Sequence, residues 1–355
     1  MMKQFLGSDI KEIVDRLGDD AKRLAGQRVL ISGGHGFLGR YLVLTLTYLN
    51  EHRLKRPCRL TVIDNHVTSA PPHFSRAWRN GYRFLRHDLT IPLTLREPVD
   101  YIVHAAGIAS PYYYRKYPLE TLEVATRGTK HLLEIARDGH VKGFLFFSSS
   151  EIYGNPDDKH IPTPESYNGY VSCLGPRACY DESKRLGETL CVIFHGQFGV
   201  PATMVRPFNI YGPGMSETDY RVIPNFASRI IGHRPLHVYG TGRQTRTFCY
   251  ITDAMVGFFK ALLSGARGEV YNIGTPVPEL SVLELAKAFQ RVTKRRVAIE
   301  VIEYPDAYPS DEPQRRCPDI SKATRHLDYH PVVGLPEGLR RFLRWATRVY
   351  TGSPF

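Results

Sequence analysis

The chain has 355 residues, of which 42% are hydrophobic and 23% charged, and its formal net charge is +12. This length and composition are typical of a folded chain with one large core or two joined cores, and they exclude a mainly disordered protein. The most apolar run, residues 37–49, contains Arg40 and is shorter than the about 20 residues that cross a bilayer, so we expect no membrane partner. The 47 Lys and Arg residues are spread along the chain without a nucleic-acid-binding module, so we expect no nucleic-acid partner.

The amino-terminal residues carry acidic side chains and lack the apolar core of a signal peptide, so we expect a cytoplasmic protein. Apolar residues recur at helical spacing between Ile10 and Leu17, which predicts a helical extension over residues 1–26. The cysteines show neither C-x-x-C pairs nor the His and Cys spacing of a metal site, so we expect free thiols and no metal. They are Cys58, Cys173, Cys179, Cys191, Cys249 and Cys317.

A glycine-rich turn follows the first predicted strand, R-V-L-I-S at residues 28–32, and precedes an apolar helix. Gly33, Gly36 and Gly39 have the spacing of a dinucleotide-binding turn, because absent side chains let the backbone bend tightly and approach a pyrophosphate. The next predicted strand ends at Asp64, 25 residues after Gly39. A carboxylate there can bind the ribose hydroxyls of NAD and repel the 2′-phosphate of NADP, so we predict NAD as the cofactor.

Strands and helices alternate from residue 28 to residue 207, which predicts an α/β fold with a doubly wound parallel (Rossmann) sheet. We expect this NAD-binding domain over residues 27–210, with parts of 240–275 returning to it. The Pro- and Gly-rich composition after Tyr211 predicts a smaller α/β lobe, mainly over residues 211–350, for the substrate. Helices are expected near 118–137 and 176–198.

Tyr180 and Lys184 are four residues apart and would share one face of a helix. An ammonium group beneath the phenol can lower its pKa from about 10, which makes Tyr180 a candidate general base. Ser149, Ser150 and Glu151 follow a predicted buried strand and should therefore lie at the carboxyl end of the sheet, where ligands bind. A bare Y-x-x-x-K motif is more often an exposed pair on a surface helix, and it is the serines and the glycine turn that favour catalysis here.

Several stretches add a resemblance to a known family. They are R-H-D-L-T-I-P-L, G-P-R-A-C-Y-D-E-S-K-R-L-G-E-T, V-Y-G-T-G-R-Q-T-R-T-F-C-Y-I-T-D and D-E-P-Q-R-R-C-P-D-I. With them, residues 27–345 resemble the extended short-chain dehydrogenase/reductases that act on nucleotide sugars, the NAD-dependent epimerase/dehydratase family. Within it, the resemblance is strongest to the UDP-glucuronate decarboxylases. It implies bound NAD, conversion of UDP-glucuronate to UDP-xylose through a 4-keto intermediate, and a homodimer formed by the helices near 118–137 and 176–198.

The resemblance also implies roles for individual residues. The implied catalytic residues are Tyr180, Lys184, Ser149, Ser150, Glu151 and Arg316, of which Arg316 would bind the sugar carboxylate. The implied cofactor contacts are Gly33, Gly36, Phe37, Leu38, Gly39, Asp64, Asn65, Asp88, Leu89, Ala105, Tyr180 and Lys184. The implied nucleotide-sugar contacts are Asn209, Arg221, Tyr239, Arg246 and Arg316.

Three alternatives stay open. A 4,6-dehydratase uses an Asp and Glu pair after the fifth strand, but Ser150 stands in the Asp position. A 4-epimerase normally has no acid at the position of Glu151. His35, where a small residue is usual, and Ala125, where the family usually has Asn, leave room for a non-catalytic NAD-binding sensor or scaffold, although the intact Y-x-x-x-K motif argues against it.

Overall fold

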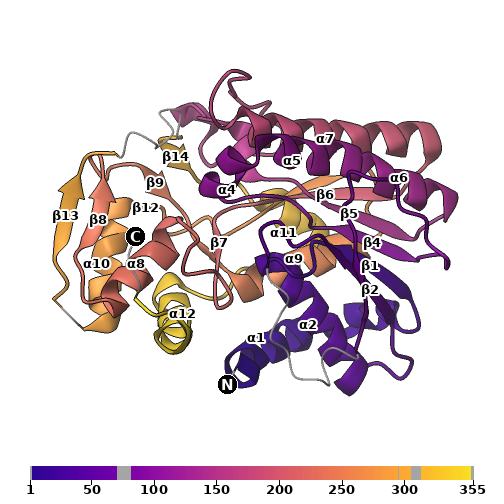
Figure 1. Ribbon diagram of the computed structural model, residues 1–355, viewed down its shortest axis with the longest axis horizontal. Helices are drawn as coiled ribbons and strands as arrows, with labels where there is room; N and C mark the ends of the chain where they lie inside the picture. Colours follow the sequence, from indigo (N-terminus) through magenta and orange to yellow (C-terminus); the bar gives the residue numbers. More distant parts are fainter. Residues whose placement is uncertain (1, 70–80, 295, 305–312, 353–355) are drawn as a thin grey trace.

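The computed structural model describes residues 2–69, 81–294, 296–304 and 313–352. Within these residues, the centre is a seven-stranded sheet whose neighbouring strands are all parallel (Figure 1). Its order is β3 (Arg83–Arg86), β2 (Arg59–Asp64), β1 (Arg28–Ser32), β4 (Tyr101–His104), β5 (Gly143–Phe147), β6 (Ala202–Pro207) and β11 (Val270–Ile273). The order in which the chain adds strands to the sheet reverses between β1 and β4. In sheets of this kind, such a switch point is where ligands bind. The predicted doubly wound sheet is confirmed.

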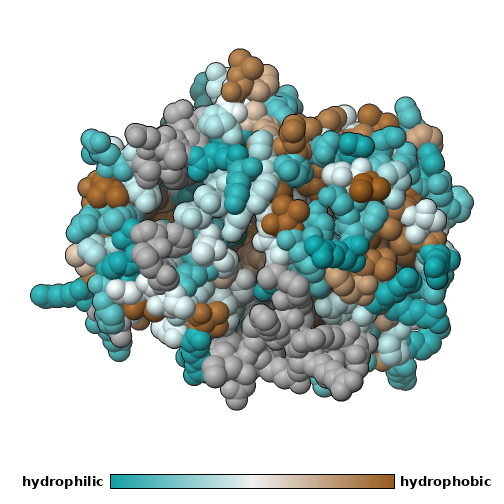
Figure 2. Space-filling view, in the orientation of Figure 1, coloured by the Kyte–Doolittle hydropathy of each residue, from teal (hydrophilic) through white to brown (hydrophobic). Residues whose placement is uncertain are grey.

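Helices cover both faces of the sheet (Figure 1). One face is covered by α2 (Phe37–His52) and α9 (Ile251–Leu263), and the other by α5 (Pro118–Glu123), α6 (Thr129–Asp138) and α7 (Ala178–Phe198). A separate cluster of buried apolar side chains fills the space on each side. Apolar surface lies over the α5 and α7 layer (Figure 2), to which exposed Leu119, Leu122, Leu186 and Ile193 contribute.

The helix expected over residues 118–137 is divided into α5 and α6 by a π-helical turn, Val124–Gly128. Thr126 and Thr129 each donate a side-chain hydrogen bond to the carbonyl four residues earlier, at 2.8 and 2.6 Å. Hydroxyls that bond back to the backbone in this way bend helices. Ala125, the departure noted in the sequence, is buried inside this turn.

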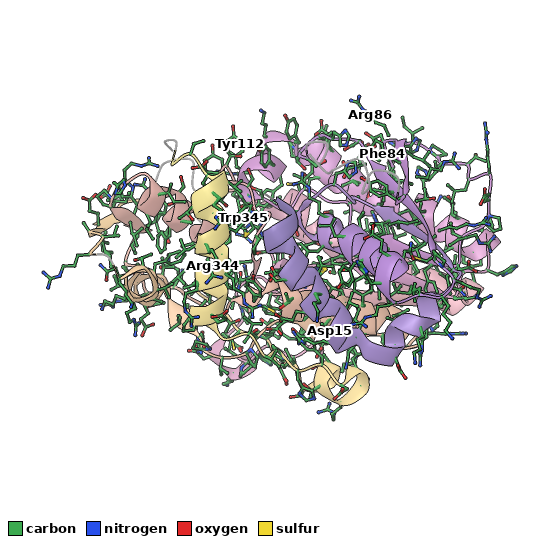
Figure 3. The ribbon with its side chains drawn as sticks, turned by 90° about the horizontal axis from the view of Figure 1, so that it is seen from below. Asp15, Phe84, Arg86, Tyr112, Arg344 and Trp345 are labelled. Carbon is green, nitrogen blue, oxygen red and sulfur yellow. The ribbon has the colours of Figure 1, made fainter. Side chains whose placement is uncertain are left out.

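The amino-terminal extension forms α1 (Met2–Leu17), followed by a 3₁₀ segment, Gly18–Leu24. The apolar side chains from Ile10 to Leu17 that recur at helical spacing are buried, because α1 packs on the outer side of α2 and α9. Figure 3 shows α1 lying beside the carboxyl-terminal helix α12 (Leu335–Val349). Arg341 of α12 donates to the Glu12 carboxylate at 2.6 Å, so the two ends of the chain are joined.

The smaller lobe contains α8 (Val222–Ile231), α10 (Val282–Thr293), α12 and the parallel pair β8 (Leu236–Tyr239) and β13 (Ile299–Ile302). A three-stranded sheet, made of β12 (Leu280–Ser281), β9 (Thr245–Arg246) and β14 (Arg315–Arg316), links it to the central domain. Short elements complete the described fold: α4 (Pro111–Lys116), the 3₁₀ turns Ser150–Tyr153 and Asp158–His160, β7 (Ile210–Tyr211), β10 (Cys249–Tyr250) and α11 (Ser321–Leu327). None of the described helices has the length and apolar character to cross a membrane.

Candidate active site

A cavity of about 570 Å³ lies where the carboxyl ends of β1, β4, β5 and β6 face the smaller lobe. Its volume is in the range of small-molecule sites. The predicted residues that line it are Gly33, Gly36, Phe37, Leu38, Gly39, Ala105, Ser149, Ser150, Glu151, Tyr180, Lys184, Asn209, Arg221, Tyr239, Arg246 and Arg316. Four predicted cofactor contacts lie outside this lining, at and after the ends of β2 and β3: Asp64, Asn65, Asp88 and Leu89.

The glycine turn has the shape that a dinucleotide requires. Gly33 has a φ of +71°, and a Cβ atom there would lie 2.6 Å from the backbone nitrogen of Ala106. A side chain at Gly33 would therefore push the turn away from the chain after β4, and a Cβ atom at Gly39 would overlap the Gly33 carbonyl oxygen and push α2 away from the turn. Gly36 caps α2 and offers no side-chain acceptor, which leaves the first N–H groups of the helix facing the cavity for a pyrophosphate. These residues fit NAD.

Asp64 stabilises the glycine turn. Its carboxylate accepts the backbone N–H of His35 at 3.0 Å, the backbone N–H of His66 at 2.9 Å and the Ser69 hydroxyl at 2.8 Å. The His35 ring stacks on the rings of His66 and Phe84, with centroids 5.1 and 4.6 Å apart, and it does not line the cavity. Burial lowers the pKa of His35 to about 4, so the ring is neutral near pH 7. The unusual His35 is therefore compatible with the cofactor site.

Tyr180 and Lys184 lie on the same face of α7 and both line the cavity. The Lys184 ammonium donates to the Phe147 carbonyl at 2.7 Å and lies 5.8 Å from the centroid of the Tyr180 ring. Burial raises the pKa of Tyr180, against the lowering expected from the Lys184 spacing, although a hydrogen bond with Ser149 and the charge of Arg221 counteract it. Burial also lowers the pKa of Lys184 to about 8. The two residues share a helix face as expected, but burial is the larger influence on the pKa of each.

Glu151 meets Arg316 at the carboxyl end of β5. The Ser149 hydroxyl accepts the Glu151 backbone N–H at 3.2 Å and so starts the 3₁₀ turn that aims Glu151 into the cavity. The carboxylate accepts from Arg316 through both of its oxygens, at 2.5 and 2.6 Å. It also forms an ion pair with Arg177, which the sequence reasoning did not single out. Arg316 reaches this point because β14 pairs with β9, which places it beside Arg246.

The smaller lobe supplies the remaining predicted substrate contacts. Arg221 is held by Asp219, whose carboxylate accepts its Nε–H at 2.8 Å, and its charge is close enough to Tyr180 to lower that pKa. Asn209, with a φ of +43°, donates its side-chain amide to the Thr247 carbonyl at 2.9 Å.

Two further predicted substrate contacts, Arg246 and Tyr239, interact with other residues of the protein. Arg246 donates to the Pro313 carbonyl at 2.7 Å, which also holds the segment before β14. The Tyr239 ring is stacked on Tyr304, with centroids 6.0 Å apart.

The sequence reasoning missed several residues of the cavity lining, among them Tyr114 and Arg177, and it gave Ser148 only a place at the strand end. The buried hydroxyls of Tyr114 and Ser148 have no hydrogen-bond partner among the described residues, so they are candidates to bind a ligand. Arg177 precedes Tyr180 by three residues, so the helical spacing could have identified it. Tyr114 carries no comparable signal, because only tertiary packing brings its ring onto Tyr180.

Comparisons with known proteins agree with this geometry. The model of the NAD dependent epimerase/dehydratase family matches residues 29–274. UDP-glucuronic acid decarboxylase 3 of Arabidopsis thaliana is 38% identical over 88% of this chain and 86% of its own length, and UDP-glucuronic acid decarboxylase 1 of Danio rerio is 37% identical over 91% and 73%. The solved structure of the epimerase Mth375 from Methanothermobacter thermautotrophicus, 28% identical, matches with a TM-score of 0.77 over 93% of this chain and 95% of that one. The chain therefore belongs to the NAD dependent epimerase/dehydratase family.

Proposed function

We propose that this protein converts UDP-glucuronate to UDP-xylose and carbon dioxide, with NAD as a recycled cofactor. Its curated relatives that carry the name UDP-glucuronic acid decarboxylase support this proposal, because they match most of the chain at about 37% identity. The observation in this chain that carries it is the ion pair of partly buried Glu151 with buried Arg316, in the same cavity as Tyr180. A guanidinium group there suits a sugar carboxylate.

We assign removal of the proton from the sugar 4-hydroxyl to Tyr180. Its phenolate would take the proton, and Ser149, which is hydrogen-bonded to Tyr180, would hold the hydroxyl in place. Bound NAD supplies the hydride acceptor for this oxidation and the hydride donor for the final reduction. Lys184 and Arg221 contribute positive charge near the phenol, which favours its ionised form during the reaction.

Oxidation at C4 makes the sugar a β-keto acid. The bond from C5 to the carboxylate carbon then breaks, carbon dioxide leaves, and the bonding electrons pass into the ketone as an enolate. Arg316 would orient the carboxylate for this step, while Ser150 and Glu151 would position the water that returns a proton to C5. Reduction of the ketone at C4 completes UDP-xylose, and the electrons balance because the same hydride is returned.

The rival reactions of the same family fit this site less well. A 4,6-dehydratase would need an acid at Ser150, and this residue is a buried serine. A 4-epimerase normally has no acid at the position of Glu151, whereas here Glu151 binds Arg316 in the cavity. A scaffold without activity would have no need for Tyr180, Ser149 and Lys184 to converge.

The test is an assay of the purified protein with NAD⁺ and a panel of nucleotide sugars, read by mass spectrometry and by release of labelled carbon dioxide. We expect UDP-xylose and carbon dioxide from UDP-glucuronate. UDP-glucose and UDP-galactose should give no decarboxylated product and no net conversion. Interconversion of UDP-glucose and UDP-galactose, or loss of water from a hexose, without carbon dioxide from UDP-glucuronate would replace this proposal by the epimerase or the dehydratase.

We also propose that the protein is a homodimer joined through α5 and α7. Leu119 and Leu122 on α5 lie exposed, as do Leu186 and Ile193 on the adjacent helix α7. A shared apolar face of this kind is typical of a buried helical interface. Light scattering should give twice the mass of one chain, and a double substitution of Leu186 and Ile193 to Glu should give a monomer.

We propose the cytoplasm as its compartment. All six cysteines are free thiols, including the exposed Cys173. Free thiols at the surface suit a reducing environment. Cell fractionation with detection of the native protein would test this, and recovery in a membrane or secreted fraction would contradict it.

A further inference from the structure

The Glu151 carboxylate lies between two guanidinium groups. Arg316 binds both of its oxygens. Arg177, at the start of α7, forms an ion pair with one of them. Both arginines are more than nine-tenths buried. One carboxylate therefore serves two cations in a place where water screens charges weakly.

Arg177 is placed by the start of α7. It is the N-cap residue of this helix, and its carbonyl accepts the backbone N–H groups of Tyr180 and Asp181 at 2.9 and 3.1 Å. Its Nε lies 3.5 Å from the Asp181 carboxylate, which supplies a second anion. The side chain thus connects the helix that carries Tyr180 with the turn that carries Glu151.

The arrangement bears on how Arg316 could bind a substrate. Arg316 offers its Nη1 and Nη2 groups to Glu151, so a sugar carboxylate that binds these two groups has to displace Glu151 from them. If Glu151 had no other cation, this exchange would leave a largely buried carboxylate without a counterion, which is unfavourable. Arg177 stays beside Glu151 during the exchange and removes this obstacle.

We infer that Arg177 is a positioning residue that keeps Glu151 neutralised and in place, so that Arg316 can leave Glu151 and bind the carboxylate of the substrate. This inference rests on the proposed decarboxylase function. It assigns to Arg177 a part in selecting sugars that carry a carboxylate. Neutral sugars do not draw Arg316 away from Glu151, so Arg177 has little influence on their binding.

The experiment compares the affinities of two ligands for the protein saturated with NADH, which cannot accept a hydride and so prevents turnover. Calorimetric titration with UDP-glucuronate and UDP-xylose is done on the wild type, Arg177→Gln, Glu151→Gln and the double variant. Arg177→Gln should weaken UDP-glucuronate by at least about 10-fold and UDP-xylose by less than about 3-fold. Adding Glu151→Gln should restore the affinity for UDP-glucuronate, because Arg316 is then no longer held by a carboxylate.

Two further variants separate charge from structure. Arg185→Gln removes a positive charge from the same helix, and Arg185 contacts the same turn by donating to the Ile152 carbonyl at 3.1 Å. This substitution should not change the ratio of the affinities for UDP-glucuronate and UDP-xylose. Arg177→Lys keeps the charge and should prefer UDP-glucuronate over UDP-xylose more strongly than Arg177→Gln does. This variant also tests the inference if the glutamine variant does not fold.

Equal weakening of both ligands by Arg177→Gln, or no recovery in the double variant, would overturn the inference and leave Arg177 a structural residue. Failure of the proposed function looks different. In that case the wild type itself would bind UDP-glucuronate no better than UDP-xylose and would release no carbon dioxide from it with NAD⁺.

Discussion

The ring of Tyr114 lies almost parallel to the ring of Tyr180, with centroids 5.4 Å apart and an interplanar angle of 14°. Tyr114 is 1% exposed, and its hydroxyl has no hydrogen-bond partner among the described residues. The side chain therefore supports Tyr180 through its ring, while burial of its hydroxyl without a hydrogen-bond partner costs stability.

This relationship predicts different outcomes for two substitutions of Tyr114. Tyr114→Phe keeps the ring and should be at least as stable as the wild type, whereas Tyr114→Ala leaves a cavity and should lower the free energy of unfolding by about 3–5 kcal/mol. Chemical denaturation followed by fluorescence measures both. A phenylalanine variant as unstable as the alanine variant would show that the hydroxyl has a structural partner.

Substitutions of Tyr180 and Glu151 should affect different steps. Tyr180→Phe removes the proposed general base, so the first appearance of NADH absorbance after mixing with UDP-glucuronate should slow by at least about 100-fold. Glu151→Gln should retain this first oxidation but slow the formation of UDP-xylose, because we assign the carboxylate to the protonation of C5 after carbon dioxide leaves. Rapid mixing followed by product analysis separates the steps, and normal NADH formation by Tyr180→Phe would remove it from the role of base.

Substitution of Arg316 should discriminate by substrate charge. Arg316→Ala should weaken binding of UDP-glucuronate by about 2–5 kcal/mol, because the sugar carboxylate would be buried without its partner. UDP-xylose, which lacks that carboxylate, should bind almost as it does to the wild type, so it serves as the internal control. Equal losses for the two ligands in calorimetry would mean that Arg316 only maintains the shape of the cavity.

Asp64 should determine the choice of cofactor. It is the last residue of β2, and its carboxylate holds the glycine turn through His35 and would repel a 2′-phosphate, so the wild type should bind NAD⁺ more tightly than NADP⁺. Asp64→Asn keeps an acceptor but loses the charge, and the preference should fall. Calorimetric titration of both cofactors decides this, and tighter binding of NADP⁺ by the wild type would contradict the assignment.

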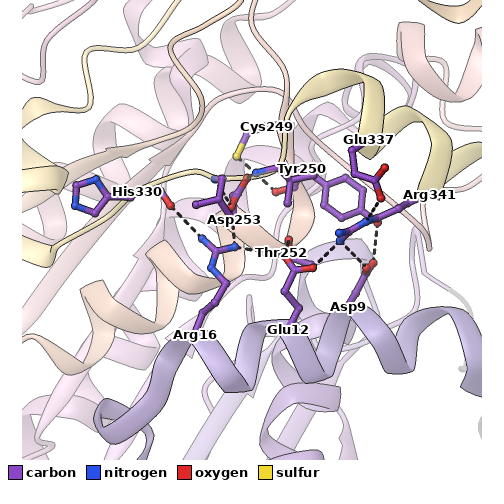
Figure 4. Close-up of polar contacts among 12 residues, drawn as sticks. Asp9, Glu12, Arg16, Cys249, Tyr250, Thr252, Asp253, His330, Glu337 and Arg341 are labelled. Atoms are coloured by element: carbon purple, nitrogen blue, oxygen red, sulfur yellow. Dashed lines mark hydrogen bonds and ion pairs between the residues drawn. The ribbon is translucent and has the colours of Figure 1, made fainter. Parts of the chain in front are cut away.

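Asp9 of α1 should make stability depend on pH in the direction opposite to most carboxylates. It accepts hydrogen bonds from Tyr250 at 2.9 Å and Tyr41 at 3.1 Å in the cluster that joins α1 to α9 and α12 (Figure 4). Burial raises its pKa from 3.8 to about 6, which corresponds to a penalty of about 3 kcal/mol when the group is ionised. The folded protein therefore binds a proton more tightly than the unfolded chain, and this penalty is absent below pH 3.8 and complete above about pH 6.

Asp9→Asn should accordingly gain stability relative to the wild type as the pH rises from about 4 to about 7, by up to about 3 kcal/mol in urea denaturation. Asp15→Asn is the control on the same helix. The pKa of Asp15 is lowered, chiefly by its hydrogen bond with Lys11, so the difference between that variant and the wild type should change in the opposite direction. A parallel trend in both variants would refute the assignment to Asp9.

The parts of this protein that sequence could predict depend on residues close together in the chain. The glycine turn needs only Gly33 to Gly39, and the pairing of Tyr180 with Lys184 needs one turn of helix. Each follows from backbone geometry that repeats every few residues. The same reasoning placed the strand ends of the sheet, and with them the side of the molecule on which the cavity lies.

Tertiary structure alone decided the electrostatics of the site. Glu151 and Arg316 are 165 residues apart, and they meet because the pairing of β14 with β9 returns the chain to the end of β5. Lys184 was expected to help lower the pKa of Tyr180, yet burial has the larger influence on the pKa of both groups. Burial and long-range ion pairs depend on which residues the fold places around a side chain. The spacing of residues along the sequence does not specify that environment.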